Sequence, residues 1–362
     1  MLEHDEVRLR CDRALSGHRR RTVRQSLAAL AESPLADLPP DLYGEGEAIA
    51  GLEREVATLL GKPAAMFTVK GVIAQQAALR TWSDRSGCRN VALHPKSHID
   101  LDERSAYERL HRLTGVRLGA DHTPFEVGDL DAVAETLGAV TVELPLRRAG
   151  YRLPEWDALV ATSEWCRSRG VPLHFDGARL WEAQPYYARP LAEIAALADS
   201  VYVSCYKGLG GLGGALLAGP DAFVAEARVW HARHCGALVT AFPFVLSASD
   251  GLRRHLPRMP NYFQRAQALS AALAGVPGAV PAPAAPQCNA FRLHLPGKVD
   301  LLKAAHLELA RESRIWLFGG FAETILPDLA MTEVSIGDAA EDLSDDEVVR
   351  LVERLIEAAG SR

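Results

Sequence analysis

The sequence lacks the features that mark membrane-spanning, nucleic-acid-binding and disulfide-rich proteins. No run among its 362 residues approaches the roughly 18 uninterrupted apolar residues of a membrane-spanning helix. Its 40 Lys and Arg residues against 46 Asp and Glu residues give a net charge of −6, without the dominant basic face of a nucleic-acid-binding protein. Its six cysteines form no CxxC pair that would suit zinc or redox chemistry. We therefore expect a cytoplasmic globular protein with no metal and with neither a membrane nor a nucleic-acid partner.

One basic cluster stands out near the N-terminus. It consists of His18, Arg19, Arg20, Arg21 and Arg24. No apolar segment of a targeting signal follows it. We expect a solvated or interface-forming helix end.

The middle of the chain alternates short apolar runs with helical patterns. Strands are expected at 64–69, 91–93, 140–142, 171–175 and 201–203, and helices at 47–60, 70–80, 130–137 and 155–169. This rhythm predicts an α/β fold, in which a mostly parallel sheet is covered by helices on both faces.

The pattern changes after about residue 250. The proline-rich segment 275–286 can be neither a helix nor a central strand. Beyond it, strands are expected at 289–295, 315–317 and 333–336, with helices at 300–311 and after Ser344, which begins a capping box. We therefore expect an N-terminal arm (1–45), a large α/β domain (46–250) and a small α+β domain (251–362).

Two segments place charged side chains where open α/β sheets bind ligands. Asp176 ends the strand pattern of 171–175, and Lys207 follows that of 201–203 and precedes a glycine-rich run. Ligands of such sheets bind at the carboxyl ends of the strands. Taken alone, Asp176 reads equally well as a helix N-cap and Lys207 as a solvated loop residue. Their occurrence together, one helix apart, favours a binding site.

The chemistry that suits these residues is that of pyridoxal phosphate. A lysine beside glycines can form a Schiff base with an aldehyde. An aspartate on the neighbouring strand can hold the pyridine nitrogen protonated, which makes the ring an electron sink. The helix that begins at Lys70 and Gly71 offers backbone amides and a positive dipole end to the phosphate.

The motifs around these residues resemble the threonine aldolases of the β-eliminating lyase family. The similar segments are His-Phe-Asp-Gly-Ala-Arg-Leu-Trp at 174–181, 198–209 around Lys207, Asp-Leu-Tyr-Gly-Glu at 41–45, and Ser-His-Ile at 97–99 with Glu103. The family consists of pyridoxal phosphate enzymes of the aspartate aminotransferase fold (fold type I). The resemblance therefore implies this fold, with a homodimer or homotetramer as the assembly.

The resemblance also implies roles for individual residues. Lys207 would link to the cofactor, Asp176 would bind its pyridine nitrogen, and His98 would stack on its ring. Arg179 would reach the ring hydroxyl or the substrate, and Lys70 with Gly71 would hold the phosphate. Arg10 and Asp12 would line the entrance of the pocket.

Departures from the family pattern gather where the substrate is expected. Lys70-Gly71-Val72 stands in place of Ser-Gly-Thr, Tyr206 in place of a serine, and Leu146 in place of a histidine that contacts the substrate hydroxyl. Ser335 stands in place of the arginine that clamps the substrate carboxylate, an interaction worth about 2–4 kcal/mol. Candidates to replace that clamp are Arg148, Arg179 and Arg314.

The resemblance implies a lyase that cleaves or forms the Cα–Cβ bond of a β-hydroxy-α-amino acid, with glycine and an aldehyde as the smaller partners. Lys207 and His98 are the expected catalytic residues. Two alternatives remain. One is a pyridoxal phosphate enzyme with a changed reaction (β-elimination, transamination or carbon–carbon bond formation). The other is a non-catalytic relative.

Overall fold

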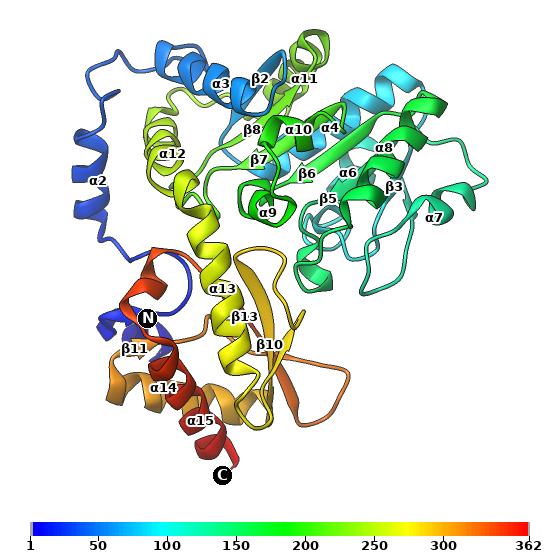
Figure 1. Cartoon of the computed structure of the whole chain (residues 1–362). Coiled ribbons are helices and arrows are strands. Elements are labelled where there is room, and N and C mark those ends of the chain that lie inside the picture. Colours follow the sequence, from blue (N-terminus) through cyan, green and yellow to red (C-terminus); the bar gives the residue numbers. More distant parts are fainter. Residues whose placement is uncertain (1–2, 361–362) are drawn as a thin grey trace. The chain divides into compact units, whose positions relative to one another are not determined.

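The computed structural model describes residues 3–360 of the chain (Figure 1). These residues form two compact units. The larger unit is Val23–Pro257, and the smaller unit joins the segment before Val23 to the segment that begins at Arg258. The domain bounds expected from the sequence, with divisions after residues 45 and 250, stay predictions.

A seven-stranded sheet forms the centre of the larger unit. Its strand order is β2-β8-β7-β6-β5-β3-β4. The strands are β2 (Ala64–Thr68), β3 (Asn90–Leu93), β4 (Thr114–Arg117), β5 (Ala139–Glu143), β6 (Leu173–Gly177), β7 (Ser200–Ser204) and β8 (Ala215–Gly219). All neighbouring strands pair in parallel except β8, which is antiparallel to both β2 and β7. The predicted mostly parallel sheet is confirmed.

Helices cover both faces of this sheet (Figure 1). The helices of the larger unit are α2 (Val23–Ala31), which stands apart from the sheet, α3 (Glu47–Leu59), α4 (Gly71–Ser86), α5 (His98–Leu101), α6 (Ala106–His111), α7 (Val127–Asp131), η1 (Arg147–Ala149), α8 (Trp156–Arg169), α9 (Leu180–Tyr187), α10 (Leu191–Ala195), α11 (Asp221–Arg233) and α12 (Phe242–His255). The chain crosses the sheet in opposite directions between β2 and β3 and between β5 and β6. Because such crossovers are right-handed, α4 and α8 lie on opposite faces.

Aromatic packing fixes α4 on one face of the seven-stranded sheet. Trp82 of α4 stacks on Phe223 of α11, with ring centroids 4.4 Å apart. The indole nitrogen of Trp82 donates a hydrogen bond of 2.8 Å to the hydroxyl of Ser200 on β7. Trp82 thereby fixes α4 against the sheet, and the N-terminus of α4 is placed at the edge where β6 and β7 end.

The smaller unit is built on an antiparallel sheet of order β12-β13-β10-β9 and a parallel pair, β1 with β11. Its strands are β1 (Arg13–Ala14), β9 (Val280–Ala282), β10 (Ala290–Pro296), β11 (Ile315–Trp316), β12 (Ala322–Glu323) and β13 (Leu329–Ser335). Its helices are α1 (Glu3–Arg10), α13 (Met259–Leu273), α14 (Val299–Ser313), η3 (Asp338–Asp342) and α15 (Asp345–Gly360), and η2 (Leu256–Arg258) carries the division between the units. The proline-containing strand β9 pairs with β10 alone and lies at the edge of the sheet, as proline requires.

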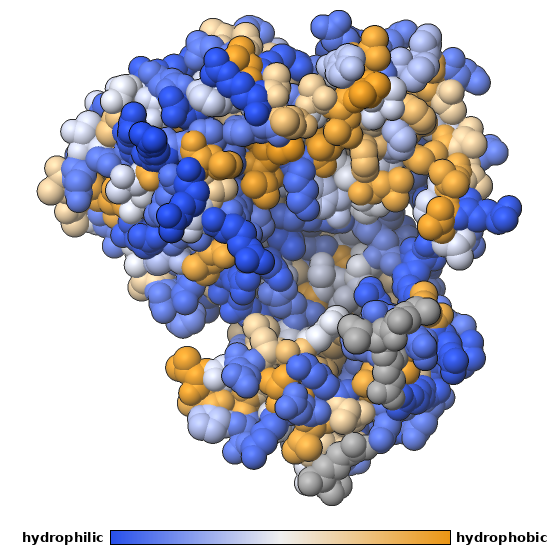
Figure 2. Space-filling model, turned by 180° about the vertical axis from the view of Figure 1, so that it is seen from behind, coloured by the Kyte–Doolittle hydropathy of each residue, from blue (hydrophilic) through white to orange (hydrophobic). Residues whose placement is uncertain are grey.

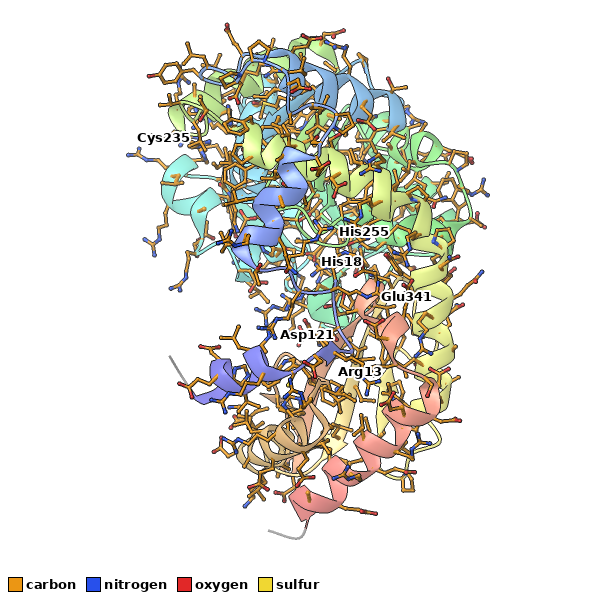
Figure 3. The ribbon with its side chains drawn as sticks, turned by 90° about the vertical axis from the view of Figure 1, so that its left-hand side faces the viewer. Arg13, His18, Asp121, Cys235, His255 and Glu341 are labelled. Atoms are coloured by element: carbon orange, nitrogen blue, oxygen red, sulfur yellow. The ribbon has the colours of Figure 1, made fainter. Side chains whose placement is uncertain are left out.

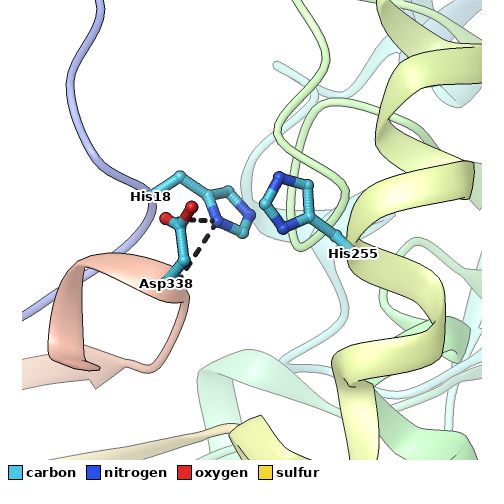
Figure 4. A group of neighbouring side chains, drawn as sticks. All are labelled: His18, His255 and Asp338. Carbon is cyan, nitrogen blue, oxygen red and sulfur yellow. Dashed lines mark hydrogen bonds and ion pairs between the residues drawn. The ribbon is translucent and has the colours of Figure 1, made fainter.

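The N-terminal segment belongs to the smaller unit because strand pairing and ion pairs hold it there. Arg13, labelled in Figure 3, pairs in register with Ile315, and its guanidinium makes two hydrogen bonds to the carboxylate of Glu347. The imidazole of His18 lies 3.1 Å from a carboxylate oxygen of Asp338 (Figure 4). Arg19 pairs with Asp342 at 2.7 Å. The basic cluster therefore begins in irregular backbone that contacts acidic groups and ends with Arg24 in the exposed first turn of α2.

Several predicted elements differ from the structure. The helix expected at 130–137 is α7, which ends at Asp131, and the carbonyl of Thr136 accepts a hydrogen bond from the side-chain amide of Asn90. Strand β4 was missed because Thr114–Arg117 contains only one large apolar residue. Strand β8 was missed because its alanines and leucines follow a glycine-rich run that resembles a loop.

The surface and the thiols add little chemistry. Apolar side chains are scattered in small groups among polar ones on the face shown in Figure 2, as is usual for protein surfaces. Within residues 3–360, no helix is both long and apolar enough to cross a membrane. All six cysteines carry free thiols; Cys166, Cys205 and Cys288 are buried, and Cys235 is exposed (Figure 3).

Helix α15 offers a test of the packing in the smaller unit. Leu355 is fully buried on it, whereas Glu353 is exposed on the same helix. Leu355→Ala is expected to lower the free energy of unfolding by about 2–5 kcal/mol, because the truncation leaves a cavity. Glu353→Ala should change it by less than about 0.5 kcal/mol. Urea titration followed by circular dichroism measures both, and equal effects would contradict the packing described.

Candidate active site

Lys207 lies in a tight loop that follows β7. The backbone N–H of Gly208 donates a hydrogen bond of 2.9 Å to a carboxylate oxygen of Glu182, on α9. A Cβ atom at position 208 would lie 2.4 Å from that oxygen, so a larger residue there would displace Glu182. Gly210 closes the loop by donating to the carbonyl of Lys207 at 2.9 Å. Glu182 and the glycines thus fix the backbone that carries the lysine.

The amine of Lys207 is less basic than an ordinary lysine. Burial and the nearby guanidinium of Arg179 lower the pKa of Lys207 to about 8, against the opposing charges of Asp176, Glu143 and Glu182. An amine with this pKa is neutral in a sizeable fraction of molecules near neutral pH. Since only a neutral amine attacks a carbonyl group, this environment suits a nucleophilic lysine.

One carboxylate oxygen of Asp176 lacks a hydrogen-bond partner among the described residues. The residue is 1% exposed at the end of β6, and its Oδ1 accepts a hydrogen bond of 3.2 Å from the backbone of Ala178. Its Oδ2 is buried and has no hydrogen-bond partner among residues 3–360. A buried carboxylate oxygen is costly unless it is paired. This oxygen therefore indicates a ligand that brings an N–H group or a positive charge.

Glu143 adds a second buried carboxyl group beside Asp176. The two residues are directly paired across β5 and β6, so their side chains share one face of the sheet. Glu143 accepts hydrogen bonds from the backbone N–H groups of His98 at 2.7 Å and of Arg147 at 3.1 Å. Burial and the charge of Asp176 raise the pKa of Glu143 to about 7. Glu143 consequently holds the backbone of His98 and loses its proton less readily than an ordinary glutamate.

His98 is part of a chain of hydrogen bonds that ends on α4. Its Nδ1 atom lies 3.0 Å from Oε1 of Glu103, and Oε2 of Glu103 accepts a bond of 2.7 Å from the amide of Gln76. Burial lowers the pKa of His98, but the hydrogen bond to Glu103 and the charges of Asp176 and Glu103 outweigh it, so that the pKa is raised. The imidazole remains one-third exposed and is therefore accessible to a ligand.

The structure brings several of the predicted site residues together. His98, Asp176, Arg179 and Lys207 interact electrostatically with one another at the carboxyl ends of β3, β6 and β7. Lys70 and Gly71 begin α4, directly after β2. Arg179 stands at the N-terminus of α9, with its guanidinium 5.4 Å from the ring centroid of Tyr151.

Other predicted residues are engaged elsewhere. Arg148 forms an ion pair with Asp102, with 3.0 Å between Nε and Oδ2, and lowers the pKa of that carboxyl group. Arg314 makes two hydrogen bonds to Asp12 on the surface of the smaller unit. Arg10 is exposed at the end of α1 in that unit. The substrate roles of Arg10, Arg148 and Arg179 stay predictions.

Sequence reasoning gave no role to three carboxyl groups of the site. Glu103 entered only as part of a motif, and neither Glu143 nor Glu182 was given a role. Each is less than a tenth exposed. The signal was present for Glu182, an acidic residue in the apolar run Leu180–Ala183, where an unpaired charge is rare. No comparable signal revealed that Glu103 would face His98, because the two residues lie five positions apart in an irregular segment.

The family described as beta-eliminating lyase matches residues 26–295, which is most of the chain. The chain belongs to the beta-eliminating lyase family. The predicted resemblance is thereby confirmed.

Individual relatives extend this family assignment. A solved structure from Listeria monocytogenes EGD-E, described provisionally as an L-allo-threonine aldolase, is 34% identical, covers 98% of this chain and 99% of its own, and superposes with a TM-score of 0.92. An aldolase from Penicillium aethiopicum is 31% identical over 58% of this chain. A low specificity L-threonine aldolase from Saccharomyces cerevisiae is 27% identical over 59%. The chain spans only about half of the length of these last two proteins, 54% and 56%.

A more distant solved structure also has the expected fold. A serine palmitoyltransferase from Sphingomonas wittichii is 17% identical, covers 93% of this chain and 84% of its own, and has a TM-score of 0.67. At this level of identity the likeness concerns the fold alone. Together with the Listeria structure it places this beta-eliminating lyase in the fold type I class that the motifs implied.

The pair of His98 and Glu103 yields a test by titration. In Glu103→Gln the carboxylate is lost, so the protonated imidazole loses its hydrogen-bonded counter-charge. The pKa of His98 is expected to fall by about one pH unit or more. Nuclear magnetic resonance of the histidine ring protons measures it, with Glu164→Gln on the exposed face of α8 as the control. A His98 pKa that stays unchanged in Glu103→Gln would refute the assigned coupling.

Proposed function

We propose that this beta-eliminating lyase binds pyridoxal phosphate and cleaves or forms the Cα–Cβ bond of a β-hydroxy-α-amino acid. The observation that carries the proposal is the pairing of Lys207, an amine of lowered basicity, with the unpartnered buried oxygen of Asp176 at one edge of the sheet. The likeness to aldolases over most of the larger unit supports the same reaction class.

The residues at this edge fit the cofactor. Lys207 would hold its aldehyde carbon, Oδ2 of Asp176 would accept the N–H of its pyridine ring, and His98 would lie against the ring. Arg179 would face the ring hydroxyl or the substrate. When bound, pyridoxal phosphate supplies an electron sink for the negative charge left on the substrate carbon. Asp176 keeps that sink effective because its buried carboxylate stabilises the protonated nitrogen.

The side chains expected near the substrate would accept and donate protons. Lys207 would hold the cofactor through its amine in the neutral form, the same kind of group that an amino acid substrate offers. His98 is the best remaining candidate to take the proton of the β-hydroxyl group, directly or through a water molecule, since Leu146 is buried and has no basic atom. Glu103 holds Nδ1 of His98 and thereby leaves Nε2 as the atom that exchanges the proton.

The substrate-facing departures favour a second candidate, a changed reaction with the same cofactor. Leu146 lacks the group that contacts the hydroxyl in the family pattern, and Arg148 is paired with Asp102. β-Elimination, transamination and carbon–carbon bond formation all use the same cofactor-binding residues. A non-catalytic relative fits less well, because a protein without chemistry has no need for an unpartnered buried carboxylate oxygen.

The assembly and the location complete the proposal. We expect an amino acid as the small-molecule partner and self-association into a homodimer or homotetramer. A cytoplasmic location remains our expectation as well.

An aldehyde assay tests the proposed reaction. The purified protein with added pyridoxal phosphate is expected to release an aldehyde from L-threonine or a larger β-hydroxy-α-amino acid. Lys207→Ala should abolish both the release and the visible absorption of bound cofactor, because it removes the attachment point. Lys303→Ala, on the exposed face of α14, is the matched control. Cofactor binding without any aldehyde would overturn the aldolase reaction and favour the changed reaction.

A further inference from the structure

Tyr151 has a backbone conformation that is unusual for a tyrosine. The segment that follows β5 turns at η1, and the backbone N–H groups of Gly150 and Tyr151 both donate to the carbonyl of Arg147, at 3.0 and 3.3 Å. Gly150 has a φ of 91° and Tyr151 a φ of 61°, so both lie in the left-handed region. Glycine adopts this conformation readily, whereas a bulky side chain is strained in it. Such strain persists only where the surrounding contacts outweigh it, and it gathers at functional sites.

The ring of Tyr151 lies against the guanidinium of Arg179. Tyr151 is only 2% exposed, and the central carbon of the guanidinium, Cζ, lies 5.4 Å from the centroid of its ring. A cation within about 6 Å of a ring centroid is attracted by the electrons of the ring face. The two residues come from the segments that follow the adjacent parallel strands β5 and β6, so the contact forms at the edge of the sheet where Asp176 lies.

Other contacts hold the segment after β5 at both of its ends. Near its start, the backbone N–H of Arg147 donates to the carboxylate of Glu143 at 3.1 Å. Beyond Tyr151, the carbonyl of Pro154 accepts a hydrogen bond of 3.0 Å from the hydroxyl of Tyr187, at the end of α9. The segment is thus fixed at points other than Tyr151, and the ring adds a support for the arginine at the start of α9.

The position of Arg179 gives such a support a purpose. Arg179 is the N-cap residue of α9, so its charge stands at the positive end of the helix dipole. The amine of Lys207 is a second positive group nearby, and Glu182 offsets part of the charge of Arg179. A ring face attracts a cation without cancelling its charge, unlike a carboxylate. Support from Tyr151 therefore holds the guanidinium at this edge and keeps it attractive to an anionic group.

We propose that Tyr151 is a positioning residue of this protein, whose ring supports the guanidinium of Arg179 and directs it at a negatively charged oxygen of the ligand. The assignment rests on the proposed function, in which Arg179 faces the hydroxyl of the cofactor ring or the substrate. It goes beyond that function because it gives a reason for a strained tyrosine after Gly150. An arginine side chain has many rotamers, and a support that restricts them lowers the entropy lost on binding. Loss of the ring should therefore weaken binding although no group that touches the ligand is removed.

Two substitutions separate the ring from the space that it fills. Tyr151→Leu keeps an apolar side chain but removes the ring, whereas Tyr151→Phe keeps the ring. Two affinities are measured by visible absorption on the full chain: that of the cofactor-free protein for pyridoxal phosphate, and that of the holoenzyme for glycine. Arg179→Met identifies which affinity depends on the guanidinium. Tyr151→Leu is expected to weaken that affinity roughly 5-fold or more, and Tyr151→Phe to leave it within about 2-fold.

A double-mutant cycle tests whether Tyr151 acts through Arg179. Once Arg179→Met has removed the guanidinium, adding Tyr151→Leu should cause no further loss. Tyr187→Leu is the matched control, because Tyr187 is a buried tyrosine that contacts the same segment at Pro154, and it should change neither affinity. Circular dichroism shows whether each variant is folded. If Tyr151→Leu does not fold, Tyr151→Met takes its place.

Several results would overturn the positioning role. Equal losses in Tyr151→Phe and Tyr151→Leu, a full additional loss in the double variant, or an equal loss in Tyr187→Leu would show that Tyr151 only packs the segment after β5. Unchanged affinities in Tyr151→Leu or in Arg179→Met would show that the pair has no part in binding. If the unchanged protein develops no visible absorption with pyridoxal phosphate, the proposed function itself fails, and the role of Tyr151 fails with it.

Discussion

The buried carboxylate of Asp176 is the constraint on which the site depends. A charge in the interior is tolerated only when hydrogen bonds and opposite charges surround it, and one oxygen of Asp176 has no such partner within the described chain. This charge acts to raise the pKa of both the Lys207 amine and the His98 imidazole. A protonated pyridine ring would supply the missing partner. Binding the cofactor therefore completes a hydrogen-bond arrangement that the fold leaves open.

The sheet explains how residues from distant segments reach this charge. Glu143, Asp176 and Tyr202 are register partners on three adjacent parallel strands, so one face displays all three. Helix α4 covers that face, and its N-terminus lies beside Tyr202. The loops after β3 and β7 then add His98 and Lys207 at the same edge. Parallel pairing thus brings residues from separate segments to the carboxyl ends of the strands, where open α/β sheets generally bind ligands.

Much of this arrangement could be predicted from the sequence. The strand ends at Asp176 and Lys207 follow from apolar runs that stop at charged residues, and the family motifs assign their partners. What could not be predicted depends on side chains that meet across elements. The contact of Tyr206 with Gly71 joins two loops, and the contact of Glu103 with His98 depends on an irregular turn. The bounds of α7 were also predicted incorrectly: it ends at Asp131, and the chain beyond it contacts other elements, as where the carbonyl of Thr136 accepts a hydrogen bond from the side-chain amide of Asn90. Local patterns carry no information on such contacts.

The central claim is that the amine of Lys207 is the group that binds the cofactor aldehyde, because its basicity is lowered and Asp176 lies opposite. Reduction of the protein with borohydride in the presence of pyridoxal phosphate, followed by mass mapping of the peptides, tests this most directly. The expected result is one stable pyridoxyl label on the peptide that contains Lys207. A label on Lys70 instead, or an unlabelled Lys207 peptide, would contradict it.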